Sequence, residues 1–350
     1  MGEGAFEGVR EFVELNQTRV RTIRMLMDPA SSYYPELPRK SKIRILWDLA
    51  VWLFRNKEIN DYYNLYGLDI AAPEREMDQY QAYRSFMRER ARGNLNGSAD
   101  SQIVLLRDKY LFFRYMDSFH LPVPRVFALR IGGNLLDADL LPLEEASLEG
   151  REDYFVKGIN GQCGMDVKHV SDYDAFVRFC RENGEQDLLF QDRVVQHHEM
   201  SRLFPDSVNT LRIVTVMKSG VPTIFSSLLR IGTKQSGVVD NTSQGGIAVG
   251  IHEDGRLMEY GFSNPEFGGR IDHHPDTGVV FSDFTIPFYR EALSLACRGH
   301  EALYRVKSIG WDIAITEHGC VLIEGNDNWE LQSFQGFYGG LKNRCKTDLS

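Results

Sequence analysis

Two short apolar segments near the C-terminus, each carrying a carboxylate, constrain this chain more than any other feature. They are residues 310–315 (Gly-Trp-Asp-Ile-Ala-Ile) and residues 321–326 (Val-Leu-Ile-Glu-Gly-Asn). The few residues between them include Glu-His-Gly, which suits a tight turn, so we expect a β-hairpin. If Asp312 and Glu324 lie on adjacent antiparallel strands, both carboxylates and the Asn326 amide can converge on one point. Hard oxygen ligands of this kind suit Mg²⁺, with room for substrate phosphates.

The length and charge of the chain limit the classes of protein to which it can belong. At 350 residues it exceeds one ordinary hydrophobic core, so we expect two or three subdomains. Hydrophobic residues make up 43% of the chain and the net charge is -9, which is ordinary for a soluble globular protein. The acidic excess lies in residues 101–350, which hold 25 basic and 34 acidic side chains without a basic stripe. A nucleic-acid partner is therefore not expected.

Cysteine usage and the start of the chain predict a cytoplasmic protein. The five cysteines are scattered and form no C-x-x-C pair, which favours a reducing compartment over a disulfide framework or a thiolate zinc site. The first residues carry mixed charges rather than the apolar core of a signal peptide. The longest apolar stretch, residues 45–54, contains Asp48 and is too short to span a bilayer. We favour packing of this stretch on the rest of the protein, and a helix lying on a membrane surface is the alternative.

Hydrophobic periodicity divides the chain into a helical front and a mixed second part. Residues 1–97 are predicted to be helical, with helices at 9–26, 40–56 and 73–92 and a linker at 93–97. Later helices are expected at 108–119, 173–183 and 286–306, and strands at 125–131, 154–157, 165–170, 188–195, 211–217, 223–230 and 246–251. This mixture indicates an α+β class rather than alternating parallel βαβ units.

A strand ending in Lys157 leads into a glycine-bearing loop that includes Gly161 and Gly164. Glycines let the backbone approach a phosphate and the ammonium neutralises it, so this segment is a candidate phosphate clamp. It is neither a Walker A loop nor a dinucleotide fingerprint, because no Gly-Lys-Ser/Thr follows and the chain continues as a strand. A hairpin with a surface lysine is the alternative. Lys109 is a second phosphate-binding candidate or a solvated helix residue.

Residues 188–199 begin as a buried strand and then turn polar. Such a segment can present backbone groups to an adenine edge and a polar side chain to a ribose; a strand leaving the core is the alternative. The pairs His197-His198 and His273-His274 lack the H-x-x-x-H helical spacing, so a metal site built on histidine is not favoured.

Arg212 and Arg230 each lie in an otherwise apolar strand. A guanidinium in such a strand needs an anionic partner, because an unpaired buried charge is costly. Two of them suggest a phosphate or an acyl-phosphate transition state, and internal ion pairs are the competing interpretation. The small, polar and glycine-rich residues 231–246 read as a loop that could close over a substrate.

Taken in order, these segments resemble the ATP-grasp superfamily, and their amino-acid sequences are similar to those of its sugar-transfer-associated branch. The resemblance covers about residues 100–340, and its most specific part is the Asp312…Glu324-x-Asn326 pattern. The other segments that carry it are residues 108–109, the Lys157 strand with its glycine loop, residues 191–194, 209–215, Arg230, and residues 239–241, 245–246, 274–275, 277–278 and 309–312.

The resemblance implies an ATP-grasp fold, in which two α+β subdomains hold ATP between them. Residues 98–195 would form the nucleotide-binding subdomain and residues 196–340 the metal- and substrate-binding subdomain, with residues 1–97 as a helical N-terminal region and residues 341–350 as a tail. Nucleotide contacts are implied for Lys109, Lys157, Gly161, Gly164, Gln191, Asp192 and Val194, with Glu199 placed at the ribose by position alone. Arg212, Arg230 and Asn241 would act on the transferred phosphoryl group, and Asp312, Glu324 and Asn326 would bind Mg²⁺.

The usual reaction of such proteins is phosphorylation of a carboxylate by ATP, followed by attack of an amine on the acyl phosphate. We therefore expect an ADP-forming, Mg-ATP-dependent carboxylate–amine ligase whose partners are a small carboxylate and an amine. Two alternatives remain open: a kinase acting on a small-molecule or sugar hydroxyl, and a non-catalytic nucleotide-binding partner in polysaccharide assembly. The sequence does not determine the oligomeric state.

Overall fold

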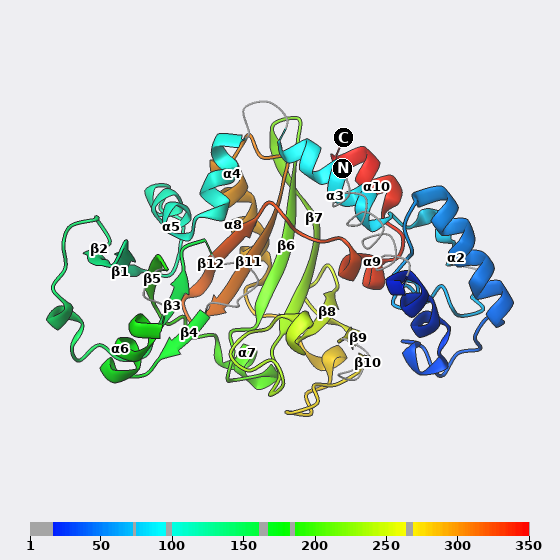
Figure 1. Cartoon of the computed structure of the whole chain (residues 1–350), viewed down its shortest axis with the longest axis horizontal. Coiled ribbons are helices and arrows are strands. Elements are labelled where there is room, and N and C mark those ends of the chain that lie inside the picture. Colours follow the sequence, from blue (N-terminus) through cyan, green and yellow to red (C-terminus); the bar gives the residue numbers. More distant parts are fainter. Residues whose placement is uncertain are drawn as a thin grey trace, which may run out of the picture. The chain divides into compact units, whose positions relative to one another are not determined.

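The computed structural model describes residues 17–72, 75–95, 100–160, 167–182, 186–263 and 269–349 (Figure 1). The chain divides into two compact units. The first comprises Met1–Arg88, Asn264–Arg270 and Glu330–Thr347, and the second comprises Glu89–Ser263, Ile271–Trp329 and Asp348–Ser350. Two helices, α3 (Tyr83–Asn94) and α10 (Lys342–Leu349), contain sequence boundaries between the units.

The first unit is built from helices around an aromatic core. Its helices are residues 17–27, η1 (Pro29–Ser31), α2 (Lys42–Asn56), η2 (Met77–Gln79) and α9 (Gln332–Tyr338). The Ser41 hydroxyl accepts a hydrogen bond from the Arg44 N–H at 3.3 Å and thereby caps α2. The core gathers side chains from the first helix, from α2 and from residues 63–82: Leu26, Ile45, Leu49, Trp52, Tyr63, Tyr66, Leu68, Tyr80 and Ala82.

The helix predicted from residue 73 begins later than its sequence suggests. The structure starts α3 at Tyr83, and the described residues before it, 75–82, contain only the short η2; residues 73 and 74 lie outside the described residues. The N–H of Gln81 donates to the Gln335 side-chain oxygen at 2.7 Å, and the Tyr80 ring stacks on Tyr66 with centroids 4.6 Å apart. These tertiary contacts hold the segment out of the helical conformation, which propensity alone does not anticipate.

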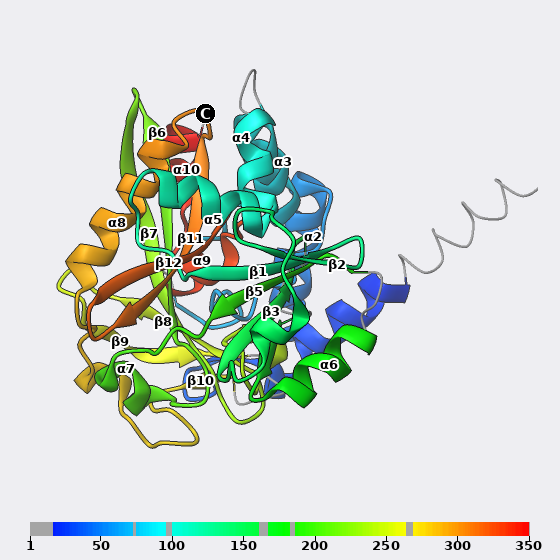
Figure 2. The same cartoon turned by 90° about the vertical axis from the view of Figure 1, so that its left-hand side faces the viewer.

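The second unit contains two antiparallel sheets, and the α+β class is confirmed. The five-stranded sheet has the order β2-β1-β5-β3-β4. Its strands are β1 (Val126–Ile131), β2 (Asn134–Asp137), β3 (Tyr154–Gly158), β4 (Val167–Val170) and β5 (Leu188–Asp192). Helix α6 (Tyr173–Glu182) packs beside β4, and Phe176 joins the core of this sheet (Figures 1 and 2).

The larger sheet carries the hairpin that the sequence predicts. Its order is β10-β9-β8-β7-β6-β11-β12. The strands are β6 (Thr210–Lys218), β7 (Val221–Ile231), β8 (Ile247–Ile251), β9 (Leu257–Phe262), β10 (Arg270–Ile271), β11 (Ser308–Thr316) and β12 (Gly319–Asn326). The strands β2, β9 and β10 were not predicted from the sequence; β2 and β10 are edge strands, and β9 lies between β10 and β8. Among the described residues, none of the helices combines the length and hydropathy needed to cross a bilayer.

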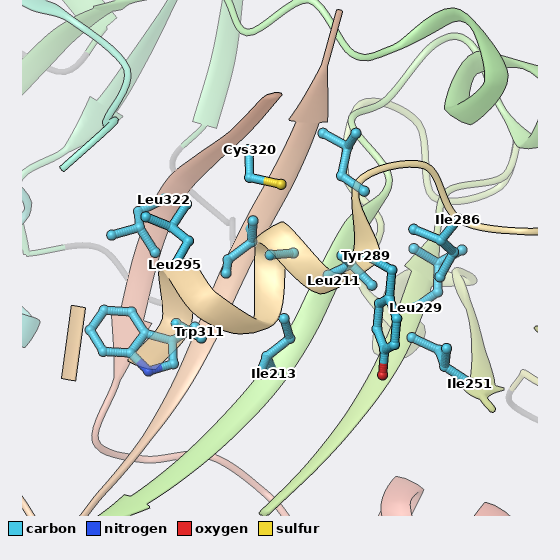
Figure 3. Close-up of a cluster of buried hydrophobic side chains, with 14 of the residues drawn as sticks. Leu211, Ile213, Leu229, Ile251, Ile286, Tyr289, Leu295, Trp311, Cys320 and Leu322 are labelled. Atoms are coloured by element: carbon cyan, nitrogen blue, oxygen red, sulfur yellow. The ribbon is translucent and has the colours of Figure 1, made fainter. Parts of the chain in front are cut away.

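Helix α8 (Tyr289–Ala302) covers one face of the large sheet. Its side chains Tyr289 and Leu295 lie among Leu211, Leu229 and Trp311 from the strands (Figure 3). Because side chains alternate along a strand, the residues between these apolar ones face the opposite side of the sheet. Arg212 and Asp312 are such residues, and the apolar packing under α8 therefore decides where they point.

Gly299 of α8 sits against Trp311 with no room for a side chain. A Cβ at this position would lie 2.9 Å from the indole. In an exposed helix, Gly→Ala stabilises by about 1 kcal/mol, but here we expect Gly299→Ala to lower the free energy of unfolding by roughly 1–3 kcal/mol through overpacking. Denaturant unfolding measures this change, with Ser294→Ala on the exposed side of α8 as the control. A stabilised Gly299→Ala variant would refute the packing.

Candidate functional site

A β-bulge decides which side of the sheet Glu324 faces. On β12, Leu322 belongs to the apolar core under α8, and strict alternation would send residue 324 to the same side. The pairing with β11 instead steps from Ile313↔Leu322 to Asp312↔Glu324, so β12 accommodates one extra residue, Ile323. The extra residue reverses the alternation. Glu324 therefore lies opposite Asp312, on the face away from α8.

Small residues in the two motifs make room for this arrangement. Gly325 lies opposite Trp311, and a Cβ on Gly325 would come within 3.1 Å of the indole. Gly310 is similarly crowded, because a Cβ there would lie 2.6 Å from Trp329. The Trp311 indole N–H also donates to the Thr215 hydroxyl at 2.8 Å. Gly325 thus leaves room for the indole on the α8 side of the sheet, and Gly310 leaves room for Trp329 on the face that carries Asp312.

Charged side chains from four neighbouring strands form a row on this face. Asp312 on β11 lies in register with Arg212 on β6 and with Glu324 on β12. Arg212 donates from Nε and Nη2 to the two carboxylate oxygens of Asp312 at 2.5 and 3.0 Å. Arg230 on β7 places Nη2 3.4 Å from Asp312 Oδ2. Asp312 is only 2% exposed, so two guanidinium groups compensate a buried carboxylate.

A second buried acid, Asp240, holds Arg230 from the other side. Arg230 Nη2 donates to Asp240 Oδ1 at 2.8 Å, and Asp240 Oδ2 accepts from the Thr210 N–H at 3.0 Å and also from the Thr210 hydroxyl. Asp240 begins the segment that carries Asn241, which precedes η5 (Thr242–Gln244). The loop is therefore tied to β6 and β7 through one carboxylate.

The two carboxylates of the hairpin have opposite pKa shifts. Burial alone would raise the pKa of Asp312, but Arg212 and Arg230 outweigh it and lower this pKa to about 2. The pKa of Glu324 is raised by burial and by the neighbouring charge of Asp312, against smaller opposing effects of Asn326 and Arg212. Asn326 Nδ2 donates to Glu324 Oε1 at 3.1 Å. Of these two carboxylates, Glu324 is thus the one whose charge is less well compensated.

These oxygens fit a divalent cation on chemical grounds. A carboxylate that is destabilised by burial and by a second carboxylate is stabilised by a nearby cation. The set of Asp312, Glu324 and the Asn326 amide offers hard oxygen donors, which suit Mg²⁺ better than softer metals.

Lys157 on β3 lies within electrostatic range of Glu324 and of Lys109, the first residue of helix α5 (Lys109–Ser118). Burial lowers the pKa of Lys157 to about 8; Glu324 opposes this effect and Lys109 adds to it. Lys157 Nζ donates to Gln191 Oε1 at 3.0 Å, and Gln191 Nε2 donates to the Pro124 carbonyl at 3.2 Å. The structure therefore brings both lysines, Gln191 and Glu324 into one polar region.

The remaining predicted residues have more varied surroundings. Asp192 ends β5 and accepts from Arg151 at 3.1 Å, and Val194 lies in the connection that follows β5. Glu199 lies in the first turn of α7 (His198–Leu203) and pairs with Arg202 at 2.6 Å. No contact joins either carboxylate to the charged row among the described interactions. Gly161 and Gly164 lie outside the described residues.

A separate group, His197, His198 and Glu317, has ligand atoms close enough to hold a metal ion. His198 Nδ1 lies 2.8 Å from Glu317 Oε1, and His197 Nε2 lies 3.5 Å from Glu317 Oε2. However, His197 Nδ1 accepts a hydrogen bond from the Glu199 N–H at 3.1 Å, which places the proton of the neutral ring on Nε2. A metal at Nε2 would displace that proton, so the group is better described as hydrogen-bonded.

Comparison with known proteins identifies the family. The family model "Sugar-transfer associated ATP-grasp" matches residues 89–347. The chain belongs to this family. The resemblance expected from the sequence is thus confirmed, and with it the ATP-grasp fold for the second part of the chain. No curated protein matches the chain in sequence.

Solved structures give distant matches to this sugar-transfer-associated ATP-grasp chain. An L-amino acid ligase from Bacillus licheniformis is 12% identical, with a TM-score of 0.43 and coverage of 71% of this chain and 46% of that one. A D-alanine–D-alanine ligase from Bacillus anthracis is 11% identical, with a TM-score of 0.42 and coverage of 70% and 67%. An N5-carboxyaminoimidazole synthase from Aspergillus clavatus, in complex with ADP and an aminoimidazole ribonucleotide, is 9% identical, with a TM-score of 0.39 and coverage of 66% and 46%. The chain spans less than half the length of the first and third of these proteins.

Asp240 and Thr210 are the site residues that sequence reasoning missed. Both lie in segments that carry the family resemblance, next to Asn241 and Arg212. A buried Arg230 indicates that an acidic partner must lie nearby. The sequence contains many acids, however, and does not identify the one that contacts β7.

We expect Asp240→Ala to lower the free energy of unfolding by about 3–5 kcal/mol, because it leaves Arg230 without its closest buried partner. The matched control is Asp254→Ala, which removes an exposed partner of Arg256 at 2.9 Å and should change stability little. Denaturant unfolding of both variants tests the difference. Equal, small losses would show that Asp240 does not anchor the arginine.

Proposed function

We propose that this protein is a Mg-ATP-dependent ligase that joins a carboxylate to an amine through an acyl phosphate. The observation that carries the proposal is that Lys157 lies within electrostatic range of Glu324, which is beside Asp312, and of a second lysine, Lys109. Anionic oxygens that need a cation thus lie next to ammonium groups that need an anion. A triphosphate with its divalent ion satisfies both.

In this proposal the chain binds ATP chiefly through positive charge and alignment. Lys109 and Lys157 neutralise the phosphates, and Gln191 holds the Lys157 ammonium in place. The adenine lies against the backbone that follows Gln191, toward Val194, where Asp192 and Glu199 are the nearby acids. Mg²⁺, when bound by Asp312, Glu324 and Asn326, supplies further charge neutralisation for the phosphates.

The proposed chemistry has two steps that need no protein nucleophile. A substrate carboxylate oxygen attacks the γ-phosphorus, the bond to the bridging oxygen breaks, and ADP leaves. An amine nitrogen then attacks the acyl carbon, phosphate leaves with the C–O bond electrons, and the nitrogen loses a proton. Arg212 and Arg230, with the Asn241 amide, stabilise the negative charge that spreads over the transferred phosphoryl group. Asp312 holds the Arg212 guanidinium in place, and Asp240 holds that of Arg230.

The reaction is tested by ADP release with a panel of amines, amino acids and carboxylated sugars. We expect release that requires both a carboxylate and an amine, and an amide product by mass spectrometry. Glu324→Gln should lower this turnover by at least about 100-fold without loss of stability, because it removes a poorly compensated charge. Phosphate transfer to a hydroxyl without an amide, or wild-type turnover in Glu324→Gln, would contradict the proposal.

The lowered pKa of Lys157 predicts how nucleotide affinity depends on pH. ATP binds the charged ammonium of Lys157, and the pKa of this lysine in the protein without nucleotide is about 8. Above that pH the lysine loses its proton, so we expect the Kd for ATP, measured with a chelator present, to rise by up to about tenfold per pH unit.

The control for this pH dependence is Lys157→Arg, which keeps a positive charge throughout the range. We expect a flat profile between pH 7 and about 9 for the variant. A wild-type profile that is equally flat, measured by isothermal titration calorimetry, would remove Lys157 from the phosphate site.

A further inference from the structure

Helix α2 has two apolar faces, and the described residues of the first unit cover only one of them. Ile45, Leu49 and Trp52 are buried in the core of the first unit. The other side of the helix carries Ile43, Leu46, Trp47, Ala50 and Phe54, all exposed. Their spacing is that of one helical stripe. Ile43 is 82%, Trp47 64% and Phe54 77% exposed. Large apolar side chains that are this exposed usually occur singly on a protein surface, not as a continuous stripe.

The stripe lies in a basic part of the chain. Residues 17–57 hold nine basic and three acidic side chains, although the whole chain has a net charge of -9. Along α2 itself, basic side chains stand at both ends, as Lys42 and Arg44 at the start and Arg55 and Lys57 at the end. Lys57 Nζ lies 4.9 Å from the centre of the Phe54 ring.

Acidic groups neutralise part of this charge but do not remove it. Asp48 accepts from Lys40 at 2.9 Å and lies 3.1 Å from Arg44, and it points away from the stripe because it is buried. Arg55 pairs with Asp78 at 2.7 Å, with both side chains more than half exposed. Exposed pairs of this kind are weak and exchange partners readily. Lys42 and Lys57 add charge at the two ends of the helix.

We propose that α2 is a docking surface for a lipid bilayer that contains anionic phospholipids. An apolar stripe with a large aromatic residue, edged by lysine and arginine, is the arrangement of helices that lie in the plane of a membrane interface. The apolar side chains enter the boundary of the acyl chains, and the basic side chains reach the headgroup phosphates. This inference does not rest on the proposed ligase reaction.

Other occupants fit the charges less well. An isologous contact between two copies through α2 would bring the basic ends of both helices together, because each copy presents the same patch. At 15 residues the helix is also too short to span a bilayer, and its other face is already buried, so it can only lie on the surface.

Tryptophan fluorescence of the full-length protein provides a direct assay. Of the four tryptophans, all within the described residues, Trp52, Trp311 and Trp329 are at most 4% exposed, so Trp47 dominates quenching by acrylamide. We expect vesicles of phosphatidylglycerol and phosphatidylcholine to shift the emission to the blue and to protect Trp47 from acrylamide. Pure phosphatidylcholine should bind more weakly, and added salt should weaken the anionic contribution.

The decisive variant is the double substitution Ile43→Ser and Phe54→Ser, which keeps the Trp47 reporter and alters only exposed positions. Vesicle co-sedimentation should fall by at least about tenfold. The matched control is Val104→Ser with Val221→Ser, which removes two apolar side chains that are 53% and 60% exposed elsewhere; it should bind like the wild type.

Several results would overturn the proposal. They are absence of vesicle binding, equal binding by the double variant, and protection of Trp47 from acrylamide before vesicles are added, which would mean that another part of the chain covers α2. A dimer that forms without lipid and dissociates in the double variant would assign the stripe to a second copy instead.

Discussion

The buried ion pair between Asp312 and Arg212 is the interaction on which the site depends. A carboxylate that is 2% exposed is tolerable only with strong compensation, and Arg212 supplies it through two hydrogen bonds from the adjacent strand. The pair fixes the register of β6 against β11 and gives Arg230 an anion to approach. It also leaves Glu324 with less charge compensation than Asp312. The same ion pair therefore accounts for the alignment of the two strands and for the different pKa shifts of Asp312 and Glu324.

Much of the site could be predicted from the sequence because its residues interrupt apolar strands. An arginine in residues 211–217 or a carboxylate in residues 310–315 must face away from the core and toward a partner. The hairpin, the strands and the α+β class follow from the same alternation. The order of the motifs then identified the family, which the match over residues 89–347 confirmed.

The sequence could not reveal features that depend on tertiary fit. Alternation along β12 places Glu324 on the core side, and only the bulge at Ile323 turns it toward Asp312. The bulge accompanies the packing of Trp311 over Gly325, which periodicity does not encode. Nor could the sequence show that Asp240 folds back onto Arg230, or which of the two apolar sides of α2 is covered. Tertiary contacts also explain why α3 begins at Tyr83, later than the sequence predicts.

The central claim is that Asp312, Glu324 and Asn326 hold a divalent ion against the phosphates of a nucleotide bound at Lys157. A crystal structure with ADP and Mg²⁺ or Mn²⁺ tests it most directly. We predict an ion about 2.0–2.2 Å from oxygens of Asp312, Glu324, Asn326 and a phosphate, with Lys157 Nζ within hydrogen-bond distance of a phosphate oxygen. Nucleotide bound elsewhere, or side-chain oxygens that remain turned away from the ion, would contradict the account.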